Sequence, residues 1–230
     1  METLQKNPSQ KRLFNYIEET IKASNVEVDF EAKERLLLYF SQLFLWNKSK
    51  NLTGIKEPSL MVYKHLGDTL ILFRHQPNAI ETMLDIGTGQ GVPGLLIKIL
   101  KPQLKVSLAD ASKKKCSFLR FIIALLNLRN IKVSEKRITA QEPPSMFEDK
   151  AFDLIVSQAT GTLSWLVRTA RPFLKENGHI IALKGPKGIY EVEELRFLYD
   201  KKQPPKIEII DEQLPLLNQK RLLISIQFHN

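Results

Sequence analysis

The residues that most clearly suggest chemistry lie in the glycine-rich stretch TMLDIGTGQGVPGLLIKIL, at positions 82–100. Its apolar start reaches an acid, Asp85, after which glycine occupies alternate positions at Gly87, Gly89 and Gly91. Glycines let the backbone turn sharply and approach a ligand without an intervening Cβ. The apolar run that follows predicts a helix, whose first N–H groups and positive dipole end suit an anionic group. The stretch therefore predicts a ligand-binding turn between a strand and a helix.

Two cofactors compete for this turn. The glycines from Gly89 onward match G-x-G-x-x-G, the dinucleotide fingerprint, but there the first glycine should follow the strand directly, and here Gly87 does. The register acid–x–Gly–x–Gly–x–Gly from Asp85 resembles the first motif of S-adenosylmethionine-dependent methyltransferases. Asp110 ends the next expected strand, where an acid can bind ribose hydroxyls. We favour S-adenosylmethionine over a nicotinamide cofactor. A purely structural turn explains neither the glycines nor Asp110.

The alternation of elements after residue 80 indicates a sheet that would present such a turn. We expect strands at 83–87, 105–110, 131–138, 152–159 and 178–185, and helices at 93–101, 112–128, 162–174 and 191–199. Two further strands, 206–214 and 221–229, are joined by a short connection and predict an antiparallel hairpin. This pattern predicts a doubly wound α/β sheet of seven strands, of which the last is antiparallel.

The chain before this sheet predicts a helical appendage. Apolar residues at spacings of three and four predict helices at 10–24, 29–47 and 57–73. Asp29 is a plausible N-cap for the second of them. We therefore divide the chain into a helical appendage at 1–78, packed on the sheet, and an S-adenosylmethionine-binding domain at 79–230.

The composition favours an intracellular protein with a polyanionic partner. The 230 residues are 43% apolar, which is enough for a sizeable core. Lys and Arg total 34 against 25 acids, a net charge of +9 that puts nucleic acid first among partners. The single cysteine, Cys116, excludes an internal disulfide framework. No apolar leader or membrane-length apolar run is present, so we expect a cytoplasmic protein. We also expect a monomer and no metal.

Beyond the glycine turn, nearly the whole chain resembles the bacterial RsmG (GidB) family. The matching segments, in the family's order, are NLTGIKEPSLMVYKHLGDTL, LDIGTGQGVPGLLIKI, LADASKKKCSFL, FDLIVSQATGTL, IIALKG and KRLLISI. The resemblance implies a Rossmann-like methyltransferase that uses S-adenosylmethionine to methylate N7 of a guanine in small-subunit (16S) ribosomal RNA. It also implies that this RNA, or its assembly intermediate, is the partner. Guanine N7 carries a lone pair and no proton, so the chemistry requires alignment and electrostatics rather than a general base.

The resemblance also assigns roles to individual residues. The catalytic candidates, which would face the mouth of the site, are His65 and Lys184. The cofactor-binding candidates are Asp85, Gly87, Thr88, Gly89, Gly91, Pro93, Asp110, Ala140, Gln141 and Gln158. The substrate-binding candidates are Asn51, Thr53, Lys64, Asp68, Lys113, Lys114, Arg137, Lys220 and Arg221. Plainer roles stay open: His65 as an ordinary helix residue, Asp68 as a local cap or pair, and the lysines as a solvated face.

Two positions depart from the family pattern. The family's fourth strand ends in S-R-A, whereas this chain has Gln158 in place of the arginine, which keeps hydrogen bonding but loses a charge. Near the end, a family arginine aligns with Lys220, although Arg221 follows at once. Three hypotheses remain: an active guanine-N7 methyltransferase, a divergent paralogue that methylates another RNA or a small substrate, and a non-catalytic protein that binds cofactor and RNA.

Overall fold

The computed structural model describes residues 7–139, 152–199 and 204–228 of the chain. Its helices are α1 Pro8–Ala23, α2 Phe30–Lys50, α3 Pro58–His75, α4 Gly94–Leu100, α5 Lys113–Leu125, α6 Leu163–Ala170 and α7 Gly188–Tyr199, with a 3-10 turn at Arg171–Phe173. Its strands are β1 Thr82–Ile86, β2 Lys105–Ala109, β3 Ile131–Ser134, β4 Phe152–Gln158, β5 Leu174–Lys184, β6 Lys206–Leu214 and β7 Gln219–Gln227. The predicted elements are present, with shifts at their ends.

Local sequence explains where the first helices begin and end. Before α1, the side-chain oxygen of Asn7 accepts the Gln10 N–H at 2.9 Å, and the Gln10 side chain accepts the Asn7 N–H in return at 3.1 Å. Asp29 caps α2, as predicted, by accepting the Ala32 N–H at 2.7 Å. Asn51 ends α2 in the left-handed conformation, with φ of 48°.

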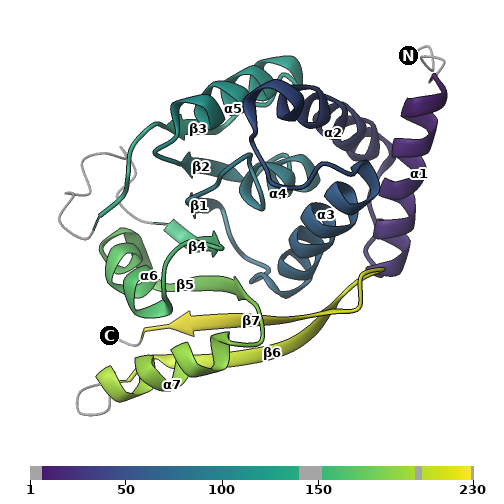
Figure 1. The fold of residues 1–230 in the computed structure, drawn as a ribbon. Coiled ribbons are helices and arrows are strands. Elements are labelled where there is room, and N and C mark those ends of the chain that lie inside the picture. Colours follow the sequence, from purple (N-terminus) through teal and green to yellow (C-terminus); the bar gives the residue numbers. More distant parts are fainter. Residues whose placement is uncertain (1–6, 140–151, 200–203, 229–230) are drawn as a thin grey trace.

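The strands form one seven-stranded sheet in the order β3-β2-β1-β4-β5-β7-β6 (Figure 1). The first five strands in this order are parallel, and β7 runs antiparallel to both β5 and β6. Crossover helices between parallel strands make this a doubly wound α/β sheet, as the sequence predicts. The seven-stranded prediction and its antiparallel last strand are confirmed.

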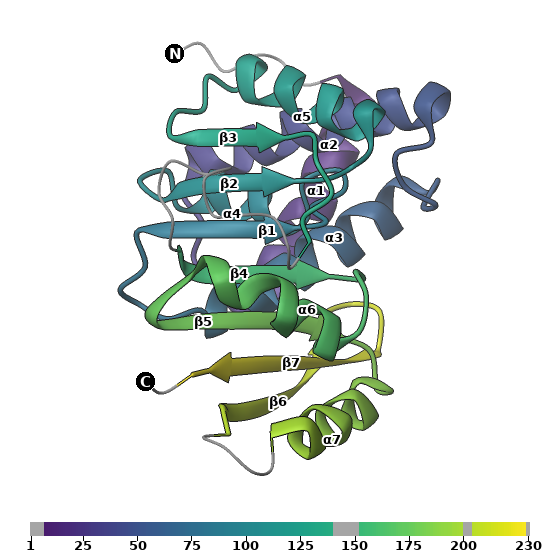
Figure 2. The same cartoon turned by 90° about the vertical axis from the view of Figure 1, so that its left-hand side faces the viewer.

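Helices cover both faces of the sheet. Helices α6 and α7 lie on one face, and α1 to α4 lie on the other (Figures 1 and 2). Successive strand residues alternate between the two faces: Met83 packs with the appendage helices, and Leu84 packs with α6 and α7. Residues of α1, α2 and α3, including Ile17, Leu36 and Leu70, belong to the same apolar cluster as the sheet. The boundary at residue 78 therefore stays a prediction, and it crosses a continuous core.

Two predicted ends after β2 were wrong for local reasons. The strand expected at 131–138 ends at Ser134, because β2 pairs with residues 131–134 alone. The helix expected to reach residue 174 ends at Ala170, and Pro172 lies in the turn that follows. Proline lacks the N–H that the helical ladder needs and clashes with the preceding turn.

The start of β5 also differs from the prediction. β5 begins at Leu174 rather than at residue 178, because a bulge interrupts the strand without ending it. Phe152 pairs with Leu174, but Leu154, two residues on, pairs with His179. No helix in the part of the chain that the structure describes is long and apolar enough to cross a membrane.

The shared core gives a first prediction. Leu70 on α3 is fully buried, so Leu70→Ala should lower the free energy of unfolding by about 2–5 kcal/mol. In urea titrations, circular dichroism and tryptophan fluorescence should report one common transition. The exposed Leu45 on α2 is the matched control, and Leu45→Ala should change stability by less than about 0.5 kcal/mol. Two separate transitions would instead show that the appendage folds as a unit of its own.

Candidate active site

The strands β1, β2 and β4 point the same way (Figure 2). A cavity of about 940 Å³ opens beyond their carboxyl ends. Open α/β sheets bind ligands at this edge, and cofactor sites have volumes of this order. Its described lining residues are Thr53, Gly54, Ile55, Lys64, His65, Ile86, Gly87, Thr88, Gly89, Gln90, Val92, Ala109, Asp110, Ala111, Lys115, Lys136, Arg137, Ile138, Thr139, Gln158, Ala159, Thr160 and Trp165. The loops after the parallel strands thus face the appendage across one cavity.

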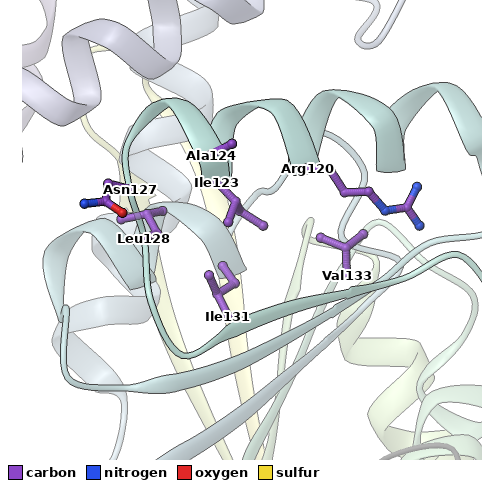
Figure 3. A pocket seen from close by; sticks show the side chains of 7 residues that line it. All are labelled: Arg120, Ile123, Ala124, Asn127, Leu128, Ile131 and Val133. Atoms are coloured by element: carbon purple, nitrogen blue, oxygen red, sulfur yellow. The ribbon is translucent and has the colours of Figure 1, made fainter.

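A second hollow, of about 280 Å³, lies between α5 and β3 (Figure 3). Aliphatic side chains such as Ile123 and Val133 line most of it. Its charged lining residue, Arg120, is paired with Glu135 at 2.9 Å. This hollow offers little that could do chemistry, so the larger cavity is the candidate site.

The buried carboxylate of Asp85 stabilises the glycine turn by accepting hydrogen bonds from it. This side chain is fully buried, and its Oδ2 accepts the Thr88 hydroxyl at 2.7 Å and the Gly94 N–H at 2.8 Å. A Cβ on Gly94 would lie 2.6 Å from the same oxygen, so the close approach requires glycine. Burial raises the pKa of Asp85 to about 7, with the nearby Asp110 adding to the shift. Asp85 therefore shapes the turn from beneath the cavity surface.

Asp110 joins the turn to the end of β2. Its Oδ2 accepts the Gly89 N–H at 2.9 Å, and its Oδ1 accepts the Ser112 N–H at 2.8 Å. Gly89 has a positive φ of 61°, and the nearest atom to a Cβ placed there is the Lys115 Nζ, at 3.7 Å. The backbone at Gly89 is therefore open toward the cavity.

His65 enters the cavity from α3 within a polar cluster. Its Nε2 lies 3.2 Å from the Gln90 Nε2 and 3.4 Å from the Thr53 hydroxyl. Burial, helped by the charge of Lys64, lowers the pKa of His65 to about 4, so the ring is neutral at physiological pH. Because the Gln90 amide nitrogen donates, the His65 Nε2 accepts and the proton sits on Nδ1. The segment that carries Thr53 is fixed by Asn47, whose side chain accepts the Thr53 N–H at 2.8 Å.

Gln158 belongs to a network that links three elements. The carboxylate of Asp68 on α3 accepts the Gln158 Nε2 from β4 at 2.6 Å and the Arg221 Nε from β7 at 2.7 Å. Asp68 is 1% exposed, and its burial raises its pKa, an effect that the contacts with Arg221 and Gln158 oppose. The residue that pairs with Asp68 is Arg221, whereas Lys220 is exposed. The Gln158 amide nitrogen gives one of its two N–H donors to Asp68, and the residue also lines the cavity.

Lys184 contacts the loop between β4 and α6. Its Nζ donates to the Gly161 carbonyl at 2.7 Å and pairs with Glu191 at 2.9 Å. Glu191 in turn accepts the Leu163 N–H at 2.7 Å. These contacts fix the loop that carries Ala159 into the cavity wall. The catalytic role predicted for Lys184 stays a prediction, and the structure shows a positioning contact.

Basic side chains form part of the cavity wall. Lys64, Lys115, Lys136 and Arg137 are among the lining residues. Lys114 reaches back to the end of α2, where its Nζ donates to the carbonyls of Lys50 and Asn51 at 2.8 and 3.0 Å. No group of three or more His, Cys, Asp or Glu side chains within the described residues is placed to hold a metal ion.

The structure brings about half of the sequence-predicted residues to the cavity surface. Those that line it are Thr53, Lys64, His65, Gly87, Thr88, Gly89, Asp110, Arg137 and Gln158. Those placed behind or beside it are Asn51, Asp68, Asp85, Gly91, Pro93, Lys113, Lys114, Lys184, Lys220 and Arg221. Ala140 and Gln141 lie outside the described residues. The functional roles of all of these residues stay predictions.

Several cavity residues were missed by the sequence analysis. Gln90 lies within the glycine turn, and Lys136 lies next to the predicted Arg137, so their neighbourhood was a usable signal. The sequence contained no signal for Trp165 or for the supporting Asn47, because an aromatic or amide side chain on a helix is usually a packing residue. Only the tertiary structure brings these side chains to the site.

Comparison with known proteins gives a consistent result. The model of the GidB family, described as rRNA small subunit methyltransferase G, matches residues 32–222. The ribosomal RNA small subunit methyltransferase G of Acinetobacter baumannii strain ATCC 17978 is 38% identical over 197 residues, 86% of this chain and 89% of that protein. The protein of the same name from Psychrobacter cryohalolentis is 34% identical over 218 residues, 95% of this chain and 86% of that protein.

Solved structures share the fold at low sequence identity. A SAM-dependent methyltransferase from Aquifex aeolicus superposes with a TM-score of 0.54 at 14% identity, covering 77% of this chain and 97% of that chain. A chain of the fibrillarin/Nop5p complex superposes with a TM-score of 0.54 at 18% identity, covering 72% of this chain and 82% of that chain. At these identities the likeness shows the fold alone.

The Asp68 network predicts unequal roles for two adjacent cations. Arg221→Leu leaves a buried carboxylate with one neutral donor and should lower the free energy of unfolding by about 3–5 kcal/mol. Lys220→Leu, at the exposed neighbouring position, should cost less than about 0.5 kcal/mol. Adding Asp68→Asn to the Arg221→Leu variant should recover part of the loss. Equal costs for the two single variants in urea titrations would contradict the pairing.

The raised pKa of Asp85 predicts how stability changes with pH. Its folded pKa of about 7 exceeds the usual 3.8, so the folded state holds a proton that the unfolded chain releases. The free energy of unfolding should therefore fall as pH rises from about 4 to about 7, by up to about 1.4 kcal/mol per unit. Asp85→Asn keeps an acceptor for Thr88 and Gly94 but does not titrate, so it should remove this slope. Urea titrations across this pH range measure it.

The control for this prediction is an exposed carboxylate. Asp211 on β6 is exposed, so Asp211→Asn should leave the pH dependence as in the unchanged protein. A slope that persists in Asp85→Asn would assign the effect to another group.

Proposed function

This chain belongs to the GidB family of small-subunit ribosomal RNA methyltransferases, and we propose on that premise how its residues methylate N7 of a guanine in 16S ribosomal RNA with S-adenosylmethionine. The observation that carries the proposal is the shared cavity. The glycine turn lines it on one side, through residues such as Gly89, and the appendage lines it on the other, through His65. A cofactor and a base can meet there.

The residues at the β1 and β2 ends fit the cofactor. The open backbone at Gly89 lets a ligand approach without meeting a Cβ. Each Asp110 oxygen accepts one N–H, and since a carboxylate has about four acceptor positions, two remain for ribose hydroxyls. Gly87 and Thr88 complete this wall. When bound, S-adenosylmethionine supplies an electrophilic methyl group on a sulfonium.

The opposite wall and the rim suit an RNA substrate. Lys64, Lys115, Lys136 and Arg137 lie around the mouth, where cations would contact phosphates. The net charge of +9 adds a long-range attraction for a polyanion. Thr53 and Gln90 bring neutral donors and acceptors that could position a base.

The proposed reaction does not require a general acid or base. Guanine N7 has no proton to remove, so catalysis rests on aligning the two reactants in the cavity. The neutral His65 is consistent with this: its ring can position a group by hydrogen bonding but does not act as a charged acid at physiological pH. Lys184 then contributes by fixing the β4–α6 loop.

Gln158 need not abolish this function. Asp68 is already paired with the guanidinium of Arg221, so replacing the family arginine by Gln158 does not leave that carboxylate without a cation. Gln158 instead brings a neutral amide to the cavity wall, with one N–H and a carbonyl oxygen that Asp68 does not use. An acceptor at this position suits an N–H donor on the cofactor or on the base. We therefore favour an active enzyme over a silent binder.

The test is a methyl-transfer experiment. The purified protein is incubated with radiolabelled S-adenosylmethionine and small ribosomal subunits that lack this methyl group, and the RNA is digested to nucleosides for mass identification. We expect 7-methylguanosine at one site. Cofactor binding without transfer would favour another substrate or a non-catalytic role.

Asp110→Ala tests the cofactor site within the same assay. It should weaken S-adenosylmethionine binding by about tenfold or more, because charge-assisted hydrogen bonds are lost, while the unfolding midpoint stays within a few degrees. Asp211→Ala, at an exposed carboxylate on β6, is the matched control and should bind as the unchanged protein does. Equal cofactor affinity in the two variants would remove Asp110 from the site.

A further inference from the structure

Trp165 is an aromatic side chain in the cavity to which the proposed function gives no role. It lies on α6, which begins after the N-cap Thr162, and its side chain is half-buried. Among the described residues that line the cavity, it is the one Phe, Tyr or Trp side chain, and the other ring there is the imidazole of His65. Its indole nitrogen and its ring have no hydrogen-bonding or aromatic partner within the described part of the chain.

The ring is held firmly from behind. It packs against an apolar cluster that includes Ile86, Ala109 and Ile138. The backbone of Gly161 lies against it, because a Cβ there would come within 2.6 Å of the indole Cε3. That glycine is in turn fixed by its carbonyl's contact with the Lys184 ammonium group. A ring positioned in this way loses little conformational freedom when a ligand stacks on it.

The apolar cluster against which Trp165 packs indicates which ligand the ring meets. Ala109 and Ile138 both belong to its apolar cluster and both line the cavity, at the ends of β2 and of the segment after β3. Asp110, which we assign to the ribose, follows Ala109 directly. The base attached to that ribose needs a flat, apolar subsite beside it, and indole rings stack well on purines.

We propose that Trp165 forms one wall of the adenine subsite and stacks on the purine of the methyl donor. The inference rests on the proposed function, since it takes S-adenosylmethionine as the ligand. It assigns an adenine contact to α6. The glycine turn and Asp110, which lie at the ends of β1 and β2, do not by themselves predict a cofactor-binding residue on that helix. Ile138, which lines the same cavity, supplies an aliphatic surface.

The test uses S-adenosylhomocysteine as the probe and calorimetry as the measurement. Trp165→Ala should raise the Kd by about tenfold or more, and Trp165→Phe, which keeps an aromatic face, should stay within about threefold. Methylthioadenosine, which lacks the amino-acid part, should show the same loss, because the purine contact is the one removed. Unfolding midpoints of both variants are measured to show that they are folded.

Fluorescence gives a second readout that does not depend on truncation. The chain has two tryptophans, and Trp46 packs against Phe118 and Phe121, with ring centroids 5.5 and 5.3 Å apart, outside the cavity lining. In a Trp46→Phe protein, emission comes from Trp165 alone and should be quenched when S-adenosylhomocysteine binds. In Trp165→Phe, the emission of Trp46 should hardly change.

The outcomes separate this inference from the proposed function. If the unchanged protein binds S-adenosylhomocysteine but neither the Kd of Trp165→Ala nor the Trp165 emission responds, the adenine contact is wrong and the proposed function stands. A variant that loses RNA affinity alone would overturn the inference and place the ring beside the substrate base. If the unchanged protein binds no S-adenosylhomocysteine, both proposals fail.

Discussion

The site depends on one buried carboxylate. Asp85 is buried at the end of β1, where its carboxylate accepts hydrogen bonds from the Thr88 hydroxyl and the Gly94 N–H. These two bonds set the conformation of the turn. The cost of burying this acid shows in its raised pKa. Because the turn closes over Asp85, the backbone at Gly89 faces outward, where Asp110 meets it from β2. Two acids therefore act on opposite sides of one loop.

The appendage is a structural part of the site rather than an attached unit. Tyr39, fully buried on α2, donates its hydroxyl to the Gln90 carbonyl at 3.0 Å, so the appendage contacts the glycine turn directly. Asp68 on α3 holds side chains from β4 and β7. The first part of the chain therefore forms the wall opposite the glycine turn, and a continuous apolar core keeps that wall in place.

Charge is distributed in a way that suits the two ligands differently. The inner surface contains a neutral His65 and an amide, Gln158, whereas the rim has cations such as Lys136 and Arg137. Under the proposed function, the exposed cations would attract phosphates, and neutral groups such as His65 and Gln158 would position the base. Arg221 is ion-paired with Asp68 and partly buried, so its position is constrained. A substitution at position 158 can then change the polarity of the cavity without unpairing a buried acid.

The sequence by itself determined the fold and the location of the site. Alternating apolar segments specify the sheet, and the register from Asp85 to Gly91 specifies the turn, because both depend on contacts between residues close in sequence. It did not determine which partner each side chain takes. That Arg221 rather than Lys220 reaches Asp68, that Lys184 fixes a loop, and that Trp165 reaches the cavity were decided only by the tertiary structure. Arg221 and Asp68 are 153 positions apart in the chain, and Lys184 and Gly161 are 23 apart. Such contacts form only when helices pack across the sheet, which local spacing does not encode.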